Sequence, residues 1–371
     1  MPQQFSPLLV RIASWENLLA AWKRVKQNKG QGGVDGITLE QFALRREPYL
    51  QDIQRLLLEG RYSPQPVKIV EVSKPSSSTT RQIGIPTIRD RIVQQATLIM
   101  LDPLFEKKFL PCSYGFRPGR SAHQAIQAID QLLAQHYYWI IEADIQDCFD
   151  TLDWSLLLNA LHEEIDDRLV LALIQRFLAA GMVRGDVRER SVRGTSQGSS
   201  LSPLLANVYL HPFDFAMTQA GYQLIRYADD FLLLTRSRKE AAKVLQCAIT
   251  IVKGQLKLKL NQEKTRIIDA RQTFFDFLGF HFHHGWKGPT RAVVEEFKRN
   301  VITLLRHARK QKSTDFLHQV NAMIRGWGHY FKIGDVKELY PQFDAWIGRM
   351  LKDISENRLR SSDIVLLRAL T

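Results

Sequence analysis

The chain has 371 residues, of which 51 are Lys or Arg and 38 are Asp or Glu, so its formal net charge at pH 7 is +13. With 45% hydrophobic and 24% charged residues, the composition excludes extended disorder and provides for a large core. The basic balance predicts a polyanionic partner, which can be a nucleic acid or an anionic membrane surface.

The sequence carries no signal for secretion or for crossing a membrane. Residues 1–6 lack the basic segment and the apolar stretch that open a secretory signal. No run approaches the ~20 apolar residues that a membrane-spanning helix needs. We therefore expect a soluble, cytoplasmic protein without a membrane partner.

Neither the cysteines nor the histidines predict a metal centre. Cys112, Cys148 and Cys247 are too far apart in sequence for a CxxC-type zinc site, so we expect reduced, partly buried thiols. Three histidines within residues 281–284 look like a metal cluster. They lie at the end of an alternating, strand-like run, which favours surface histidines instead.

The N-terminal third predicts helices followed by a strand. Apolar residues recur at helical spacing over residues 15–22, and a second helix is expected near residues 39–60, after a glycine-rich loop. Residues 67–73 alternate between apolar and polar positions, which is typical of a strand. The polar run that follows, flanked by Lys74 and Arg81, is typical of a hairpin tip or of a solvated β-turn.

Two short apolar runs lead into carboxylates in the middle of the chain. Asp144 follows one run, and the adjacent Asp229 and Asp230 lie between strand-like flanks, which predicts a hairpin tip. A single Asp after a strand is usually a turn residue. Three ionised carboxylates beside a core need a cation, and two Mg²⁺ ions roughly 3.5–4 Å apart are the arrangement that supports nucleotidyl transfer.

The chain turns helical from residue 295 onward. Phe297 begins an apolar face on the first of these helices, whereas Lys298 and Arg299 belong to a basic face. Residues 291–371 contain 15 Lys and Arg against 9 Asp and Glu. This excess suits phosphate binding, but it is also typical of a solvated helix face.

Residues 227–230 read Tyr-Ala-Asp-Asp, which resembles the signature of reverse transcriptases. The similarity extends along the chain, since nine blocks in family order resemble the group II intron branch of that family, and chance agreement of so many short motifs is a poor explanation. The blocks lie at residues 32–36, 81–95, 113–121, 139–152, 197–207, 227–230, 261–265, 277–280 and 321–330.

The resemblance implies an α+β fold, a right-hand polymerase with fingers, an antiparallel-sheet palm and a three-helix thumb. We expect an N-terminal helical extension over residues 1–65, fingers and palm over residues 66–288, and a thumb or maturase-like (X) helical domain over residues 289–371. The fingers are expected around residues 66–130 and 160–200. The DNA-binding and nuclease extension that group II intron proteins often carry is not expected.

By this resemblance, Asp144, Asp229 and Asp230 are the catalytic carboxylates. Together with Ile145 they are expected to hold two Mg²⁺ ions. The primer 3′-hydroxyl then attacks the α-phosphate of a paired dNTP, and pyrophosphate leaves.

Other residues of the resembled blocks are expected to bind the nucleotide. Lys74 and Arg81 match fingertip cations that close on the triphosphate, and Gln197 borders the pocket with the glycine that follows it. Phe149 matches an aromatic that leaves no room for a 2′-hydroxyl and so favours dNTP over NTP, with an ordinary core position as the alternative. Lys264 matches a lysine near the nucleotide, although a surface or helix-capping role fits it equally well.

Four basic residues are expected to contact nucleic acid. Arg117 and Arg120 lie in a glycine- and proline-containing block and can bind template phosphates, although solvated loop arginines are nearly as common. Lys298 and Arg299 are expected to contact the duplex from the thumb, and a merely solvated helix face is the alternative.

The resemblance therefore implies an RNA-directed DNA polymerase that extends a DNA or RNA primer with dNTPs on an RNA template. It also implies binding of a structured intron RNA and assistance to its splicing. A standalone relative that serves CRISPR spacer acquisition, phage defence or repair is an alternative. A noncatalytic RNA-binding splicing cofactor is another, and the presence of all three acidic residues and Phe149 argues against it.

Overall fold

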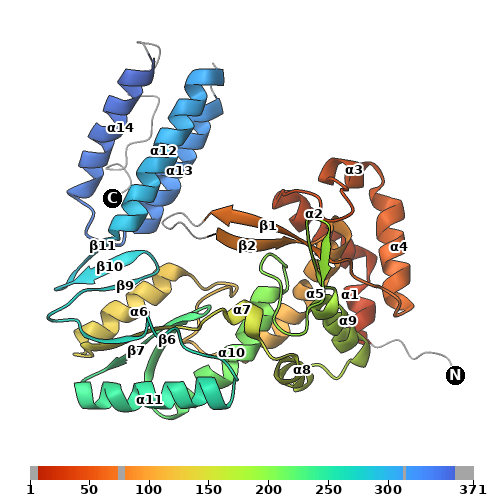
Figure 1. Cartoon of the computed structure of the whole chain (residues 1–371), viewed down its shortest axis with the longest axis horizontal. Coiled ribbons are helices and arrows are strands. Elements are labelled where there is room, and N and C mark those ends of the chain that lie inside the picture. The colour runs from red at the N-terminus through yellow and green to blue at the C-terminus, as the bar shows by residue number, and fades with distance from the viewer. Residues whose placement is uncertain (1–6, 74–79, 312–314, 356–371) are drawn as a thin grey trace. The chain divides into compact units, whose positions relative to one another are not determined.

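The structure is a computed structural model, which describes residues 7–73, 80–311 and 315–355. Packing divides the chain into two compact units, the first formed by residues 1–121 and 141–267 and the second by residues 122–140 and 268–371. Both units contain helices and strands, so the predicted α+β class is confirmed (Figure 1). The division predicted at residues 65 and 288 stays a prediction.

Helices make up the N-terminal part of the first unit. They are α1 (Pro7–Ile12), α2 (Trp15–Gln27), α3 (Leu39–Leu44), α4 (Arg46–Leu58) and α5 (Ile88–Glu106). The helix expected near residues 39–60 forms as two helices, because Arg45 at their junction has a non-helical φ of −122°. α2 packs along α5, with Leu18 and Trp22 buried. The Asn17 side chain donates to the Ala96 carbonyl across this contact (3.0 Å).

A four-stranded sheet follows these helices. Its strands are β1 (Val67–Ser73), β2 (Thr80–Ile85), β4 (Met182–Arg184) and β5 (Val187–Glu189), in the order β2-β1-β4-β5. β1 and β2 pair antiparallel, whereas β1 and β4 pair parallel, so the sheet is mixed. The hairpin tip predicted between β1 and β2 lies outside the described residues. Nearby, the buried Asp90 carboxylate accepts hydrogen bonds from the Tyr62 and Thr87 hydroxyls and from the Gln65 amide.

A second sheet carries the acidic residues. Its strands are β3 (Trp139–Asp144), β6 (Gln223–Tyr227), β7 (Asp230–Thr235) and β8 (Arg266–Asp269), in the order β6-β7-β3-β8. β6 and β7 are an antiparallel hairpin, as predicted for the palm. The apolar residues of β7 are buried because α10 (Ser202–Gln219) packs on β6 and α11 (Arg238–Gly254) packs on β7. The first unit also contains α7 (Cys148–Thr151), α8 (Trp154–His162) and α9 (Arg168–Ala179).

The second unit combines a small sheet with helices. Its elements are α6 (Ala122–Ala134), β9 (Phe275–Phe277), β10 (Phe280–His283), β11 (Trp286–Pro289), α12 (Arg291–Gln311), α13 (Asp315–Phe331) and α14 (Leu339–Ser355). Phe297, Trp327 and Phe343 stack within the bundle that α12, α13 and α14 form, so the predicted three-helix thumb is confirmed in the described residues (Figure 1).

α6 belongs to this second unit, although its first residues were expected in the fingers. Two contacts account for its place. The His123 ring nitrogen Nε2 lies 2.7 Å from the Tyr330 carbonyl oxygen, and Asp130 forms an ion pair with Lys287. Histidines at the end of β10, His283 and the following His284, are exposed.

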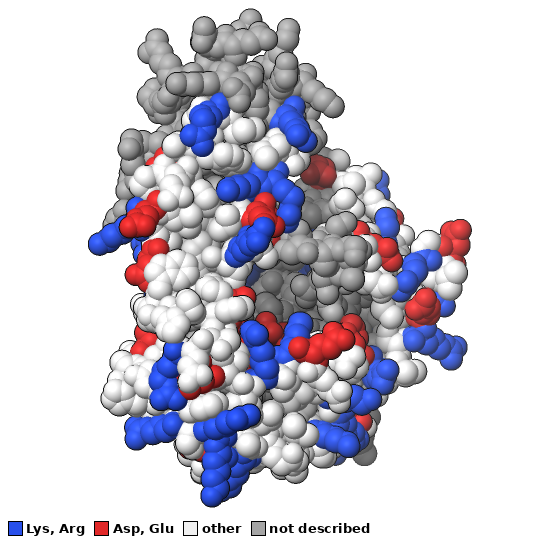
Figure 2. Space-filling view, turned by 60° about the vertical axis from the view of Figure 1, so that its left-hand side comes forward, with Lys and Arg blue, Asp and Glu red and all other residues white. Residues whose placement is uncertain are grey.

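The three cysteines are free thiols. None of the three cysteines forms a disulfide, and burial raises the pKa of the Cys112 thiol to about 11. Among the helices that the structure describes, none has the length and apolarity needed to cross a membrane; a cytoplasmic location stays a prediction. Figure 2 shows basic side chains spread over one face of the molecule, with acidic side chains between them.

Candidate active site

The three predicted catalytic carboxylates line a single cavity of about 760 Å³ in the first unit. Asp144 ends β3, and Asp229 and Asp230 lie at the turn of the β6–β7 hairpin, where Tyr227 pairs with Asp230. The Ile145 amide donates to the Asp229 carbonyl oxygen (3.3 Å), which joins the end of β3 to the hairpin. Residues 85 positions apart in the chain therefore meet, as the sequence predicted.

The neighbouring carboxylates perturb Asp230. Asp230 is exposed as a residue, but desolvation of its carboxyl group, the neighbouring Asp144 and then Asp229 raise its pKa to about 7. The Lys264 ammonium lies 2.8 Å from the Asp144 Oδ2 atom, and this hydrogen bond raises the pKa of Lys264. One ammonium thus balances part of the charge that the three carboxylates concentrate.

The main chain between residues 259 and 264 positions this lysine. The Asn261 amide donates to the Asp144 carbonyl (2.8 Å), and the Gln146 amide donates to the Lys259 carbonyl (2.9 Å). The Asn261 side chain then accepts the Glu263 amide (3.1 Å), which forms the turn that presents Lys264 to Asp144. The structure thus places Lys264 beside Asp144, and its predicted contact with the nucleotide stays a prediction.

The donor set suits a hard divalent cation. Carboxylate oxygens are the ligands that Mg²⁺ prefers. Desolvation and then the neighbouring carboxylates raise the pKa of Asp230, and a cation would relieve the repulsion among them. In the described part of the chain, no three His, Cys, Asp or Glu side chains are already arranged as a metal site. The two Mg²⁺ ions expected from the sequence therefore stay a prediction.

An aromatic pair stands next to the carboxylates. Phe149 lines the cavity, its side chain is largely buried, and its carbonyl accepts the Thr195 amide (2.6 Å). Its ring meets the Phe116 ring edge-on, with centroids 6.4 Å apart. Phe116 is 53% exposed, has a φ of +58° and lies 6.5 Å from the Tyr227 ring.

The segment around Gln197 closes another wall of the cavity. The Gln197 side-chain amide donates to the Asp150 carboxylate (3.3 Å), and both residues line the cavity. The Gln197 carbonyl accepts the Gly84 amide of β2 (2.6 Å). The side chains of Thr80 and Gln82 on the same strand also line the cavity, so β2 borders the site.

Comparison with known proteins decides the family. Residues 72–282 match the family model described as "Reverse transcriptase (RNA-dependent DNA polymerase)", and residues 294–363 match "Group II intron, maturase-specific domain". The chain belongs to the reverse transcriptase family. The predicted enzyme class, an RNA-directed DNA polymerase of the group II intron lineage, is thereby confirmed.

Curated relatives agree with this family. The reverse transcriptase is 31% identical to Protein YkfC of Escherichia coli (strain K12) over 344 residues, which cover 80% of this chain and 90% of YkfC. It is 28% identical to the Group II intron-encoded protein LtrA of Lactococcus lactis subsp. cremoris over 347 residues, which cover 76% of this chain but only 57% of LtrA. The chain thus spans little more than half of LtrA.

A solved structure titled "Partial Cas6-RT-Cas1--Cas2 complex" is also similar. The identity is 26%, the match covers 67% of this chain and 43% of that chain, and the TM-score is 0.44.

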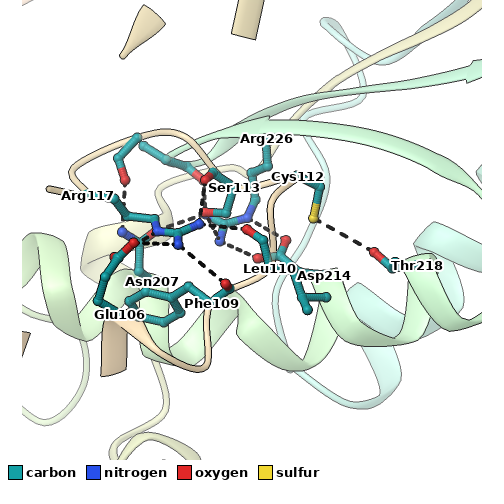
Figure 3. Close-up of polar contacts among 12 residues, drawn as sticks. Glu106, Phe109, Leu110, Cys112, Ser113, Arg117, Asn207, Asp214, Thr218 and Arg226 are labelled. Carbon is teal, nitrogen blue, oxygen red and sulfur yellow. Dashed lines mark hydrogen bonds and ion pairs between the residues drawn. The ribbon is translucent and has the colours of Figure 1, made fainter. Parts of the chain in front are cut away.

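Arg117 does not have the place that the sequence predicted. Its side chain is 2% exposed, and its guanidinium donates to both Glu106 carboxylate oxygens and to the carbonyls of Phe109, Leu110 and Ser113 (Figure 3). These partners satisfy the donors inside the protein. The predicted phosphate contact is therefore wrong for Arg117, which holds the loop that follows α5.

The other predicted basic contacts are only partly described. Arg120 is half-buried with its guanidinium 5.7 Å from the Tyr114 ring centroid, and Lys298 on α12 lies over the rings of Phe343 and Trp346. Arg299 is exposed on the same helix. Lys74 lies outside the described residues, and so does the side chain of Arg81, whose main chain belongs to β2.

Sequence reasoning missed two residues of this region. Phe116 lies within residues 113–121, in which only Arg117 and Arg120 were predicted to have a role. The adjacent Gly115 is the sequence signal for a close approach of two main-chain segments. A Cβ atom on Gly115 would lie 2.4 Å from the Ala228 nitrogen, so the loop packs directly on the catalytic hairpin. Asp150 was also missed, because its link to Gln197 spans 47 residues.

Replacing Gly198 by Ala tests the wall formed by Gln197. Gly198 has a φ of +118°, and a Cβ there would lie 2.2 Å from the Gly84 carbonyl oxygen. This oxygen belongs to the main chain of β2, so it cannot move aside to relieve the clash. We expect the segment to separate from β2 and kcat/KM for dNTP to fall by about 10- to 100-fold in primer extension. Gly254→Ala, at an open position at the end of α11, is the control. An unchanged kcat/KM in Gly198→Ala contradicts this account of the wall.

Proposed function

We propose that Asp144, Asp229 and Asp230 catalyse extension of a primer 3′-hydroxyl by dNTPs on an RNA template. The observation that carries the proposal is the meeting of the three carboxylates in one cavity, beside Phe149 and Gln197. These carboxylates, with the Ile145 carbonyl, would hold two Mg²⁺ ions. Such ions lower the pKa of the attacking hydroxyl and stabilise the charge on the leaving pyrophosphate.

The protein's own contribution is position and electrostatics. Bonds from the Ile145 and Asn261 amides fix the two segments that bear the carboxylates. Lys264 lies at the same edge and supplies positive charge where phosphate oxygens would gather. Lys74 and Arg81 are proposed to add cations from the β1–β2 hairpin, which borders the cavity through β2.

Phe149 is proposed to select the sugar. Its ring lines the cavity and is held against Phe116 and by the main-chain bond to Thr195, so it has little room to move aside. A rigid ring at this place would collide with a ribose 2′-hydroxyl and accept a deoxyribose. The proposal therefore assigns DNA rather than RNA as the product.

Asp229→Ala tests the catalytic assignment. On a primed RNA template with Mg²⁺ and dNTPs, we expect the unchanged protein to extend the primer and the variant to lose extension, because the metals lose a ligand. Asp166→Ala replaces an exposed acid that does not line the cavity and should extend normally. Extension by well-folded Asp229→Ala at the normal rate would refute the assignment.

Phe149→Val tests sugar selection. We expect the preference for dNTP over NTP, measured as a ratio of kcat/KM values on the same template, to fall by about 10- to 100-fold. Phe105→Val replaces a buried aromatic ring of α5 outside the cavity by a smaller side chain, and it controls for general loosening of the core. If the ratio stays constant in Phe149→Val, another group excludes the 2′-hydroxyl.

We further propose that the C-terminal bundle binds a structured intron RNA and assists its splicing. The match of residues 294–363 to the maturase-specific domain supports this role. α12 offers Arg299 on an exposed position, while Phe297 on the same helix is buried in the bundle. One face of α12 thus packs in the bundle, and another is exposed to solvent.

Arg299→Gln tests this contact. We expect weaker binding to a group II intron RNA. The slope of log K against the logarithm of the salt concentration should become shallower by about one unit, because one phosphate contact is lost. Arg238→Gln removes an equal charge from the exposed start of α11 and is the control. Equal effects of both variants, or equal affinity for an unrelated RNA of the same length, count against specific intron binding by α12.

A further inference from the structure

A buried arginine lies directly beneath the catalytic hairpin. Arg226 is the penultimate residue of β6, and both it and Asp214 on α10 are 0% exposed. The guanidinium donates from Nε to Asp214 Oδ1 (2.6 Å) and from Nη2 to Asp214 Oδ2 (2.5 Å). This bidentate ion pair ties the hairpin to the helix packed against it (Figure 3).

The remaining donors of Arg226 reach three further residues. Nη2 donates to the Ser113 hydroxyl (2.8 Å), and Nη1 donates to the Asn207 side-chain oxygen (3.0 Å) on α10. Nη1 also donates to the Ala228 carbonyl (2.8 Å), which belongs to the turn itself. The guanidinium therefore links α10 and the loop before Gly115 to the residue that precedes Asp229.

The turn needs such support. Ala228 has a φ of +59°, a conformation that residues with a Cβ rarely adopt. Asn207 also donates to the Gly115 carbonyl (2.9 Å), and Gly115 packs on the Ala228 nitrogen. The main chain of Arg226 is bonded on both sides, its amide to the Cys112 carbonyl and its carbonyl to the Tyr114 amide (both 2.8 Å). Contacts thus hold the turn from two directions.

Stability alone does not account for this arrangement. Replacement of a buried ion pair by apolar residues of similar volume is often neutral or stabilising, because both charges lose their hydration on burial. An apolar pair could fill the same space, but it could not donate to the Ala228 carbonyl. The guanidinium adds a hydrogen bond to the Ala228 carbonyl, which fixes the orientation of the turn.

We infer that Arg226, held by Asp214 and Asn207, is a positioning residue that sets the Ala228–Asp229 turn and so aligns Asp229 and Asp230 with Asp144. The inference rests on the proposed catalytic role of Asp229 and Asp230. Arg226 lies under the turn and acts through the Ala228 carbonyl rather than on the substrate.

The double variant Arg226→Met with Asp214→Leu tests this role, because it removes both charges and leaves neither unpaired. We expect a folded protein with a melting temperature near that of the unchanged chain. In primer extension we expect kcat to fall by about 10- to 100-fold with little change in KM for dNTP. Mn²⁺ binding, followed by electron paramagnetic resonance without nucleic acid, should weaken, since the carboxylates no longer converge. A folded double variant with normal kcat and normal Mn²⁺ binding overturns the inference.

Two further variants keep the test decisive. Asn207→Ala removes one partner of the guanidinium and leaves the ion pair, so it should lower kcat even where the double variant does not fold; normal kcat in that variant overturns the inference. Arg117→Met with Glu106→Leu removes the neighbouring ion pair, of which only Arg117 is buried and which bonds the loop but not Ala228. This control variant should bind Mn²⁺ normally. If it loses as much Mn²⁺ binding as the Arg226→Met, Asp214→Leu variant, Arg226 has no specific role. Inactive Asp229→Ala beside a fully active double variant would reject only the inference, whereas active Asp229→Ala would reject the catalytic proposal.

Discussion

Mutual repulsion of Asp144, Asp229 and Asp230 is the constraint that the surrounding structure has to meet. Carboxylates drawn into one cavity repel one another, and desolvation together with the neighbouring Asp144 and Asp229 raises the pKa of Asp230. A flexible hairpin would relax by moving its acids apart. The chain instead bonds the main chain of both acidic segments to neighbours, so the charges stay together until a cation balances them.

Different interactions oppose the repulsion on the two sides of the cavity. At the end of β3, the Lys264 ammonium neutralises part of the charge on Asp144. Beneath the hairpin, the guanidinium of Arg226 is already matched by the Asp214 carboxylate, so it restrains the turn geometrically more than it neutralises the acids. The Lys264 side chain is largely exposed, whereas the buried Arg226 serves as a fixed support.

The sequence reveals the acidic residues because charge seldom follows an apolar strand without a reason, and Phe149 because the block pattern fixes its spacing. It does not reveal partners that only folding brings together. Arg117 looked like a phosphate ligand, since nothing in a loop sequence shows that carbonyls and a carboxylate already satisfy the guanidinium. Arg226 looked like an ordinary polar position of a strand, because its partners on α10 lie 12 and 19 residues earlier.

The two proposed activities draw on different parts of the chain. Every residue that lines the carboxylate cavity belongs to the first unit, whereas the helices that match the maturase-specific domain belong to the second. The rings of Phe297, Trp327 and Phe343 pack together in the core of those helices. Because the proposals place the chemistry in internal bonds of one unit and intron RNA binding in surface charge of the other, we expect that either activity can be lost by substitution while the other persists.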